Sequence, residues 1–125
     1  MNISDLILLV DGTSLTSTGF SPRPVKGAFA ADLMSDVLAS IQPEAVLVTG
    51  LCNPQVIRTA HMADVAAIIL VRGKIPPKET IALAEEEGIP FISTPFGMYE
   101  VCGRFHRAGL ISLESPADID NCDCG

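Results

Sequence analysis

Residues 66–95 constrain the fold of this chain more than any other stretch. They read AAIILVRGKIPPKETIALAEEEGIPFISTP. The first six residues are apolar without interruption, which is typical of a strand buried on both faces. Apolar residues at helical spacing follow and end at Gly88, and residues 89–93 form a second short strand. Two strands joined by a helix make a βαβ unit, in which the strands lie parallel with a right-handed crossover.

The spacing of apolar residues predicts four further helices. They cover residues 3–10, residues 32–41, residues 54–63 and a segment that ends before Gly109. Asp32 is expected to be the N-cap of the second of these helices, and Asn53 the N-cap of the third, with Pro54 at its first position. Thr94 and Pro95 are expected to open the last helix.

Four further strands are predicted from short apolar or β-branched segments. They cover residues 14–18, 25–30, 45–49 and 110–113. Strands therefore alternate with helices along the chain, which predicts an α/β fold with a mostly parallel sheet. Residues 1–113 are expected to form one domain, and residues 114–125 an acidic tail that contains cysteines.

Composition excludes several classes of function. The formal net charge is −7, with only 8 basic residues and no tryptophan, so neither a cationic surface nor aromatic stacking platforms are expected for nucleic acid. No apolar run approaches the roughly 20 residues that span a bilayer. The N-terminus carries Asp5 and Asp11 and lacks a basic region, which predicts a cytoplasmic protein. Its four cysteines are then expected to be thiols or metal ligands.

Three loops that follow predicted strands are expected to meet at one edge of the sheet. They hold nine candidate ligand-binding residues: Thr49, Gly50, Cys52, Asn53, Arg72, Gly73, Lys74, Ser93 and Thr94. Two of these loops run into helix N-termini, which favour anions. We therefore predict a pocket for a phosphorylated or carboxylated small molecule. The alternative is that these residues only serve the turns, where such residue types are needed anyway.

The sequence lacks the motifs of an autonomous enzyme. Gly73 and Lys74 do not belong to a G-x-x-x-x-G-K-[ST] loop, and no G-x-G-x-x-G motif is present. No nucleophile stands beside an obvious base. Asp32 and Asp36 could act as paired carboxylates, but we favour a helix cap for Asp32 and a solvent-facing position for Asp36. We therefore predict no kinase activity and no catalytic residues.

Four residues could instead bind a metal or support redox chemistry. Cys102 and His106 stand four residues apart on a predicted helix, and Cys122 and Cys124 lie in the tail. Thiolate and imidazole are ligands of zinc and other thiophilic ions. The alternative is that Cys102 fills the core and His106 is exposed. Cys52 lies before a helix N-terminus, which lowers a thiol pKa, but it has no neighbouring base.

Two segments carry a resemblance to a known family. They are residues 25–39, VKGAFAADLMSDVLA, and residues 66–105, in which Val71, Arg72 and Gly73 precede the proline-bearing turn. The chain resembles the DRTGG domain from about residue 3 to residue 109, and it is similar to the N-terminal domain of HPr kinase/phosphorylase. The resemblance implies a three-layer α/β/α sandwich, frequent dimerisation and a regulatory or binding role. The DRTGG string and the kinase domain are absent, so kinase activity does not carry over.

Three hypotheses about function follow. The first is a non-catalytic regulatory or ligand-sensing module that binds a phosphorylated metabolite, a nucleotide or a partner protein. The second is a thiol-based accessory protein that uses the C-terminal cysteines for metal or redox chemistry. The third is a structural subunit that docks on a larger enzyme through apolar helix faces. A homo-oligomer is expected, and no cofactor can be named.

Overall fold

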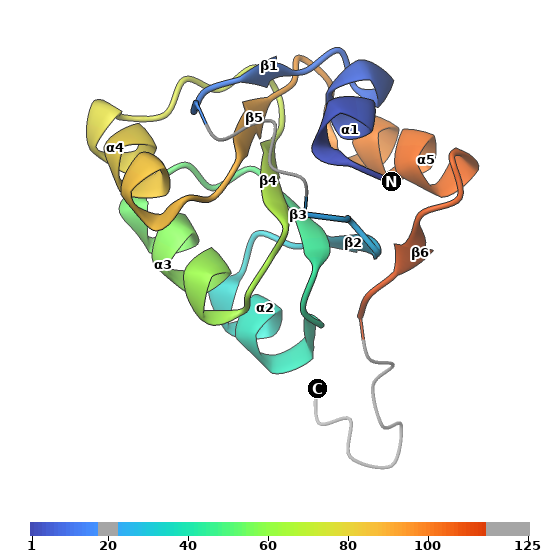
Figure 1. Ribbon diagram of the computed structural model, residues 1–125, viewed down its shortest axis with the longest axis horizontal. Helices are drawn as coiled ribbons and strands as arrows, with labels where there is room; N and C mark the ends of the chain where they lie inside the picture. The colour runs from blue at the N-terminus through green and yellow to red at the C-terminus, as the bar shows by residue number, and fades with distance from the viewer. Residues whose placement is uncertain (18–22, 115–125) are drawn as a thin grey trace.

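A six-stranded sheet forms the middle layer of the protein, whose structure, a computed structural model, describes residues 1–17 and 23–114. The strand order is β1-β5-β4-β3-β2-β6. All neighbouring strands are parallel except β1 and β5, which are antiparallel. Helices α2, α3 and α4 cover one face and α1 and α5 the other (Figure 1). The predicted three-layer α/β/α sandwich with a mostly parallel sheet is confirmed.

The elements match the expected order, with ends that differ by a few residues. The helices are α1 (Ile3–Leu9), α2 (Met34–Ser40), α3 (Pro54–Met62), α4 (Lys78–Glu87) and α5 (Met98–Arg107). The strands are β1 (Thr13–Ser14), β2 (Gly27–Ala30), β3 (Ala45–Thr49), β4 (Ala67–Leu70), β5 (Phe91–Ser93) and β6 (Ile111–Ser112). Residue 18, the end of one predicted strand, lies outside the described residues.

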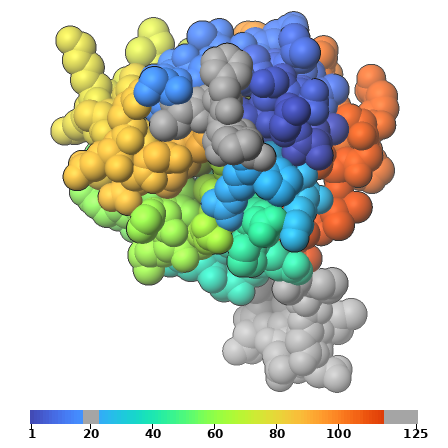
Figure 2. Space-filling model, in the orientation of Figure 1, coloured from blue at the N-terminus to red at the C-terminus, as the bar shows by residue number. Residues whose placement is uncertain are grey.

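The central strands β3 and β4 are buried along their whole length because helices cover both faces. Successive side chains point to opposite faces, so Leu47 packs with α2, α3 and α4, whereas Val46 and Val48 pack with α1 and α5. The two apolar layers thus share one sheet. Figure 2, in the same view, shows α4 in yellow and gold and α1 in dark blue on different sides of the molecule.

The chain path brings the strand ends together. From β2 to β5 the chain steps across the sheet in one direction, with α2, α3 and α4 on the same face. After β5 it crosses to the other face as α5 and returns to place β6 beside β2. The carboxyl ends of β2, β3, β4 and β5 therefore lie at one edge of the sheet.

Two predicted helix starts are wrong. The N-cap of α2 is Leu33 rather than Asp32, and no side chain caps this helix. The Asp32 carboxylate accepts a hydrogen bond from the Gly50 N–H instead, at 2.7 Å. Helix α5 begins at Met98 after Gly97, not at Thr94 and Pro95. Thr94 is held by the turn before α5, where its carbonyl accepts from the Gly73 N–H.

Within the described ranges, no helix combines the length and the apolar character needed to cross a membrane.

Glu85 on α4 fixes the segment that follows β1. Its carboxylate accepts one hydrogen bond from the Ser17 N–H at 2.6 Å and another from the Ser17 hydroxyl at 2.7 Å. The hydroxyl, and then the N–H, lower the pKa of Glu85 from its ordinary value. Both donors stabilise the ionised carboxylate, so this contact depends on pH.

We expect Glu85→Gln to lower the melting temperature near neutral pH and to lose this effect in acid. The pKa of Glu85 is lower in the folded than in the unfolded state. The stabilisation is therefore complete above the unfolded pKa and is lost as the pH falls through the folded pKa. Melting curves of both proteins between about pH 7 and about pH 3 test this. Glu86→Gln is the control, and an equal difference at both ends of the range would contradict the assignment.

Candidate functional site

Gly50 lies at the centre of the edge where the strands end. We call the rim the four loops at this edge, residues 31–33, 50–53, 71–77 and 94–97. A Cβ on Gly50 would lie 3.2 Å from Arg72 Nη1, 3.4 Å from Lys74 Nζ and 3.5 Å from Asp32 Oδ1. These three residues, the charged triad, therefore converge on one backbone position. They do so because β3 lies between β2 and β4 in the sheet.

Hydrogen bonds hold part of the charged triad in place. Asp32 Oδ1 accepts from the Gly50 N–H at 2.7 Å and from the Thr49 hydroxyl at 3.2 Å. Lys74 Nζ donates to the Gly50 carbonyl at 2.6 Å. Neither Asp32 Oδ2 nor the Arg72 guanidinium has a hydrogen bond or an ion pair to any described residue. The triad thus combines groups fixed by the backbone with groups that remain available.

The backbone at Arg72 is strained. Its φ is 66° and that of Gly73 is 61°, and the left-handed region costs a residue with a Cβ about 1–3 kcal/mol. Two hydrogen bonds to the loop before α5 hold this conformation. The Arg72 N–H donates to the Phe96 carbonyl at 2.7 Å, and the Gly73 N–H donates to the Thr94 carbonyl at 2.8 Å. These N–H groups are occupied, so a ligand would meet the cationic side chains.

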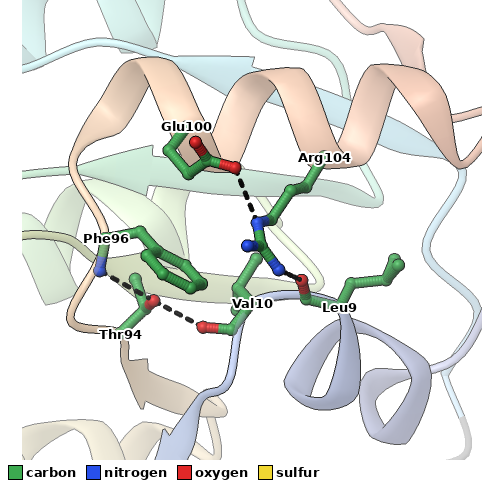
Figure 3. Close-up of polar contacts among 6 residues, drawn as sticks. All are labelled: Leu9, Val10, Thr94, Phe96, Glu100 and Arg104. Carbon is green, nitrogen blue, oxygen red and sulfur yellow. Dashed lines mark hydrogen bonds and ion pairs between the residues drawn. The ribbon is translucent and has the colours of Figure 1, made fainter.

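Thr94, the first residue of the fourth rim loop, is buried. Its hydroxyl donates to the Val10 carbonyl at 2.6 Å and accepts from the Phe96 N–H at 3.2 Å (Figure 3). Its hydroxyl is therefore committed to joining the turn before α5 to the end of α1. Ser93 is half-buried in β5, where it pairs with Leu70 and Thr13.

The remaining candidates lie in the loop after β3. Cys52 is half-buried and packs against the apolar layer beneath α2, α3 and α4. Asn53 is exposed and is the N-cap of α3, with Pro54 at the first position as predicted, but its side chain makes no capping hydrogen bond. The structure therefore brings together Thr49, Gly50, Arg72 and Lys74. Cys52 and Asn53 follow Gly50 in the same loop.

Asp32 is a rim residue that the sequence pattern predicted to be a helix N-cap instead. It follows β2 at the same edge as the candidates that follow β3 and β4. Its position two residues after a strand was a usable signal. The helical pattern that starts nearby favoured a cap, because Asp is a common N-cap residue.

Cys102 and His106 line one cavity of about 240 Å³ between α5 and strands β2 and β6. Burial raises the pKa of the Cys102 thiol, which disfavours the reactive thiolate. No group of three His, Cys, Asp or Glu residues that could hold a metal ion occurs in the part of the chain that the structure describes. Cys122 and Cys124 lie outside the described residues. Of the four residues in the thiol-based hypothesis, the structure therefore describes only Cys102 and His106.

The fold is that of an α/β domain with charged loops gathered at the carboxyl ends of parallel strands. The family model of the DRTGG domain matches residues 5–108. The chain therefore belongs to the DRTGG domain family. No curated protein matches it.

A solved structure has the same fold. It contains the CBS and DRTGG domains of the regulatory region of Clostridium perfringens pyrophosphatase, complexed with its activator, diadenosine tetraphosphate. The TM-score is 0.71 at 18% sequence identity, over 87% of this chain and 47% of that chain. The match thus covers less than half of that regulatory region, and at this identity it shows the fold alone.

Proposed function

We propose that the protein is a non-catalytic ligand-sensing module whose rim binds the phosphate groups of a small molecule. The observation that carries this proposal is the exposed Arg72 guanidinium, which has no partner among the described residues. The chain has 15 acidic residues against 8 basic ones, so ion-pair partners are abundant. An arginine that forms no ion pair with any described residue, on strained backbone, suits a partner that comes from outside.

The chemistry of the rim supports a phosphate ligand. A guanidinium presents several N–H donors in one plane and binds phosphate oxygens two at a time. Lys74 supplies a second positive charge from the same loop, next to Gly50. Helix α3 starts at this edge with Pro54 and directs its positive dipole end towards it. In parallel sheets, ligands usually bind outside the carboxyl ends of the strands.

The two threonine hydroxyls that could act as nucleophiles near the rim are already engaged. The Thr49 hydroxyl donates to Asp32, and the Thr94 hydroxyl donates to the Val10 carbonyl. Asp32 Oδ1 accepts a hydrogen bond from the Gly50 N–H, so this oxygen is not free to act as a base. This arrangement favours binding over catalysis. We therefore include Thr49 and Thr94 as residues that shape the rim.

The related regulatory region provides a candidate class of ligand. That region is complexed with diadenosine tetraphosphate, a nucleotide with several phosphates. We propose that this protein likewise responds to a phosphorylated nucleotide or metabolite and passes the signal to a second copy of the chain or to a larger enzyme. Because the match covers 47% of that chain, this step rests on the rim's own chemistry.

We expect Arg72→Ala to weaken binding of tripolyphosphate and diadenosine tetraphosphate by about tenfold or more, since a hydrogen-bonded charge pair contributes about 1.5–3 kcal/mol. Isothermal titration calorimetry of the whole chain measures this. Arg107→Ala is the matched control. It removes the same positive charge at the C-terminal end of α5, whereas the rim lies at the N-terminal end of that helix. The proposal fails if neither probe binds the wild type, or if the two variants weaken binding equally.

A further inference from the structure

The geometry of the charged triad points to the class of ligand, and this inference rests on the proposed function. We infer that the rim takes a ribonucleotide: Arg72 and Lys74 hold its phosphates, and Asp32 accepts hydrogen bonds from its ribose hydroxyls. Asp32 needs a role in this site, because its carboxylate would otherwise repel an anion. Its Oδ1 lies 3.5 Å from the point where both cations converge beside Gly50.

The second carboxylate oxygen of Asp32 is available to accept a hydrogen bond from a ligand. Oδ1 is occupied by the Gly50 N–H and the Thr49 hydroxyl. Oδ2 has no donor among the described residues, and the side chain is exposed. An ionised carboxylate can only accept hydrogen bonds. A ligand that fits the whole triad therefore carries hydrogen-bond donors close to its phosphate.

The neighbouring charges indicate that these donors are neutral. A metal ion or an ammonium group at Asp32 would stand close to both the Arg72 guanidinium and the Lys74 ammonium. Like charges at such separations repel each other even near a protein surface. Hydroxyl groups satisfy the carboxylate without that repulsion. A vicinal diol beside a phosphate is the arrangement found in ribonucleotides and in sugar phosphates.

Two exposed apolar side chains favour the nucleotide over a plain sugar phosphate. Leu33 directly follows Asp32 and is 61% exposed, and Ile75 directly follows Lys74 and is 90% exposed. Their loops follow β2 and β4, on either side of Gly50. A nucleobase has an apolar face that would cover such side chains, whereas a sugar phosphate has none. Burial of this apolar surface would add to the affinity.

The test compares four probes by calorimetry on the whole chain. They are ATP, 2′,3′-dideoxy-ATP, tripolyphosphate and ribose 5-phosphate. We expect the wild type to bind ATP about tenfold more tightly than the dideoxy analogue, because hydrogen bonds to a charged group are lost. Ribose 5-phosphate should bind more weakly than ATP.

Asp32→Asn should reduce the preference for ATP over the dideoxy analogue to about twofold or less. The amide oxygen of Asn can still accept from the Gly50 N–H, so the rim keeps its shape. Tripolyphosphate should bind this variant at least as tightly as the wild type, because a repelling charge is removed. Glu86→Gln on α4 removes the same charge away from the triad and should leave the preference unchanged.

The outcomes separate this inference from the proposed function. Equal affinity of the wild type for ATP and the dideoxy analogue, with tripolyphosphate still bound through Arg72, overturns the ribose assignment and leaves the phosphate site standing. Binding of ribose 5-phosphate as tight as that of ATP overturns the nucleotide class. If none of these four probes binds, and diadenosine tetraphosphate does not bind either, both the inference and the proposed function fail.

Discussion

Replacing Gly27 with alanine is expected to lower the free energy of unfolding by about 3 kcal/mol or more, which is the upper range for overpacking a core. Gly27 is buried in β2, where it pairs with Ile111 of β6. A Cβ at this position would collide with the Ile111 carbonyl oxygen and would lie 2.7 Å from Leu113 Cγ. The first of these is a backbone atom, so a change of side-chain rotamer cannot relieve the clash. We expect β6 to be forced away from β2.

Gly103→Ala provides the matched control for this prediction. Gly103 lies in α5, and a Cβ there would meet no atom within 4 Å. Alanine favours the helix by about 1 kcal/mol relative to glycine, so this variant should be more stable than the wild type. Urea denaturation followed by circular dichroism measures both changes. A loss below about 1 kcal/mol for Gly27→Ala would show that β6 can shift without strain.

Thr94→Val is expected to lower the free energy of unfolding by about 2–4 kcal/mol, because each buried group left without a partner costs about 1–3 kcal/mol. Valine matches threonine in shape but has no hydroxyl. The Val10 carbonyl would lose its donor and the Phe96 N–H its acceptor (Figure 3). Both groups lie where α1 meets the turn before α5, so that junction should loosen first.

Thr94→Ser separates the hydroxyl from the methyl group. Serine keeps both hydrogen bonds and loses one buried methyl, so it should cost about 1 kcal/mol. Hydrogen exchange of the α1 amides adds a local measurement, since exchange should accelerate in Thr94→Val and change little in Thr94→Ser. Equal destabilisation of the two variants would mean that packing of the methyl, rather than the hydroxyl, makes Thr94 important.

The fold was predictable from the sequence because both faces of the sheet are covered. Full burial left apolar runs in residues 45–48 of β3 and throughout β4, and the breaks after these strands identified the βαβ units. The position of β6 was not predictable. Its two residues are exposed, and it joins β2 only because α5 crosses to the opposite face. The spacing of apolar residues along the sequence does not indicate that β6 pairs with β2.

The candidate site was predictable in its location but not in its contacts. The residues after β3 and β4 had to meet, since parallel strands place their carboxyl ends together. The hydrogen-bond partners of Asp32 and Thr94 could not be predicted, because the sequence allows two partners for each. Asp32 could cap its own helix or bind Gly50, and the backbone of β3 decided in favour of Gly50. Thr94 could face a ligand or the interior, and the Val10 carbonyl decided that choice.

The backbone hydrogen bonds of Arg72 and Gly73 also join the rim, through residues 94–97, to helix α1. The loop that they contact, residues 94–97, holds α1 through Thr94 and includes Phe96, whose ring lies 4.1 Å from the Arg104 guanidinium (Figure 3). Arg104 in turn donates to the Leu9 carbonyl at the end of α1. A partner bound to α1 and a small molecule bound at the rim would therefore contact elements that the same hydrogen bonds join. Any effect of one on the affinity of the other would be reciprocal, by the same factor.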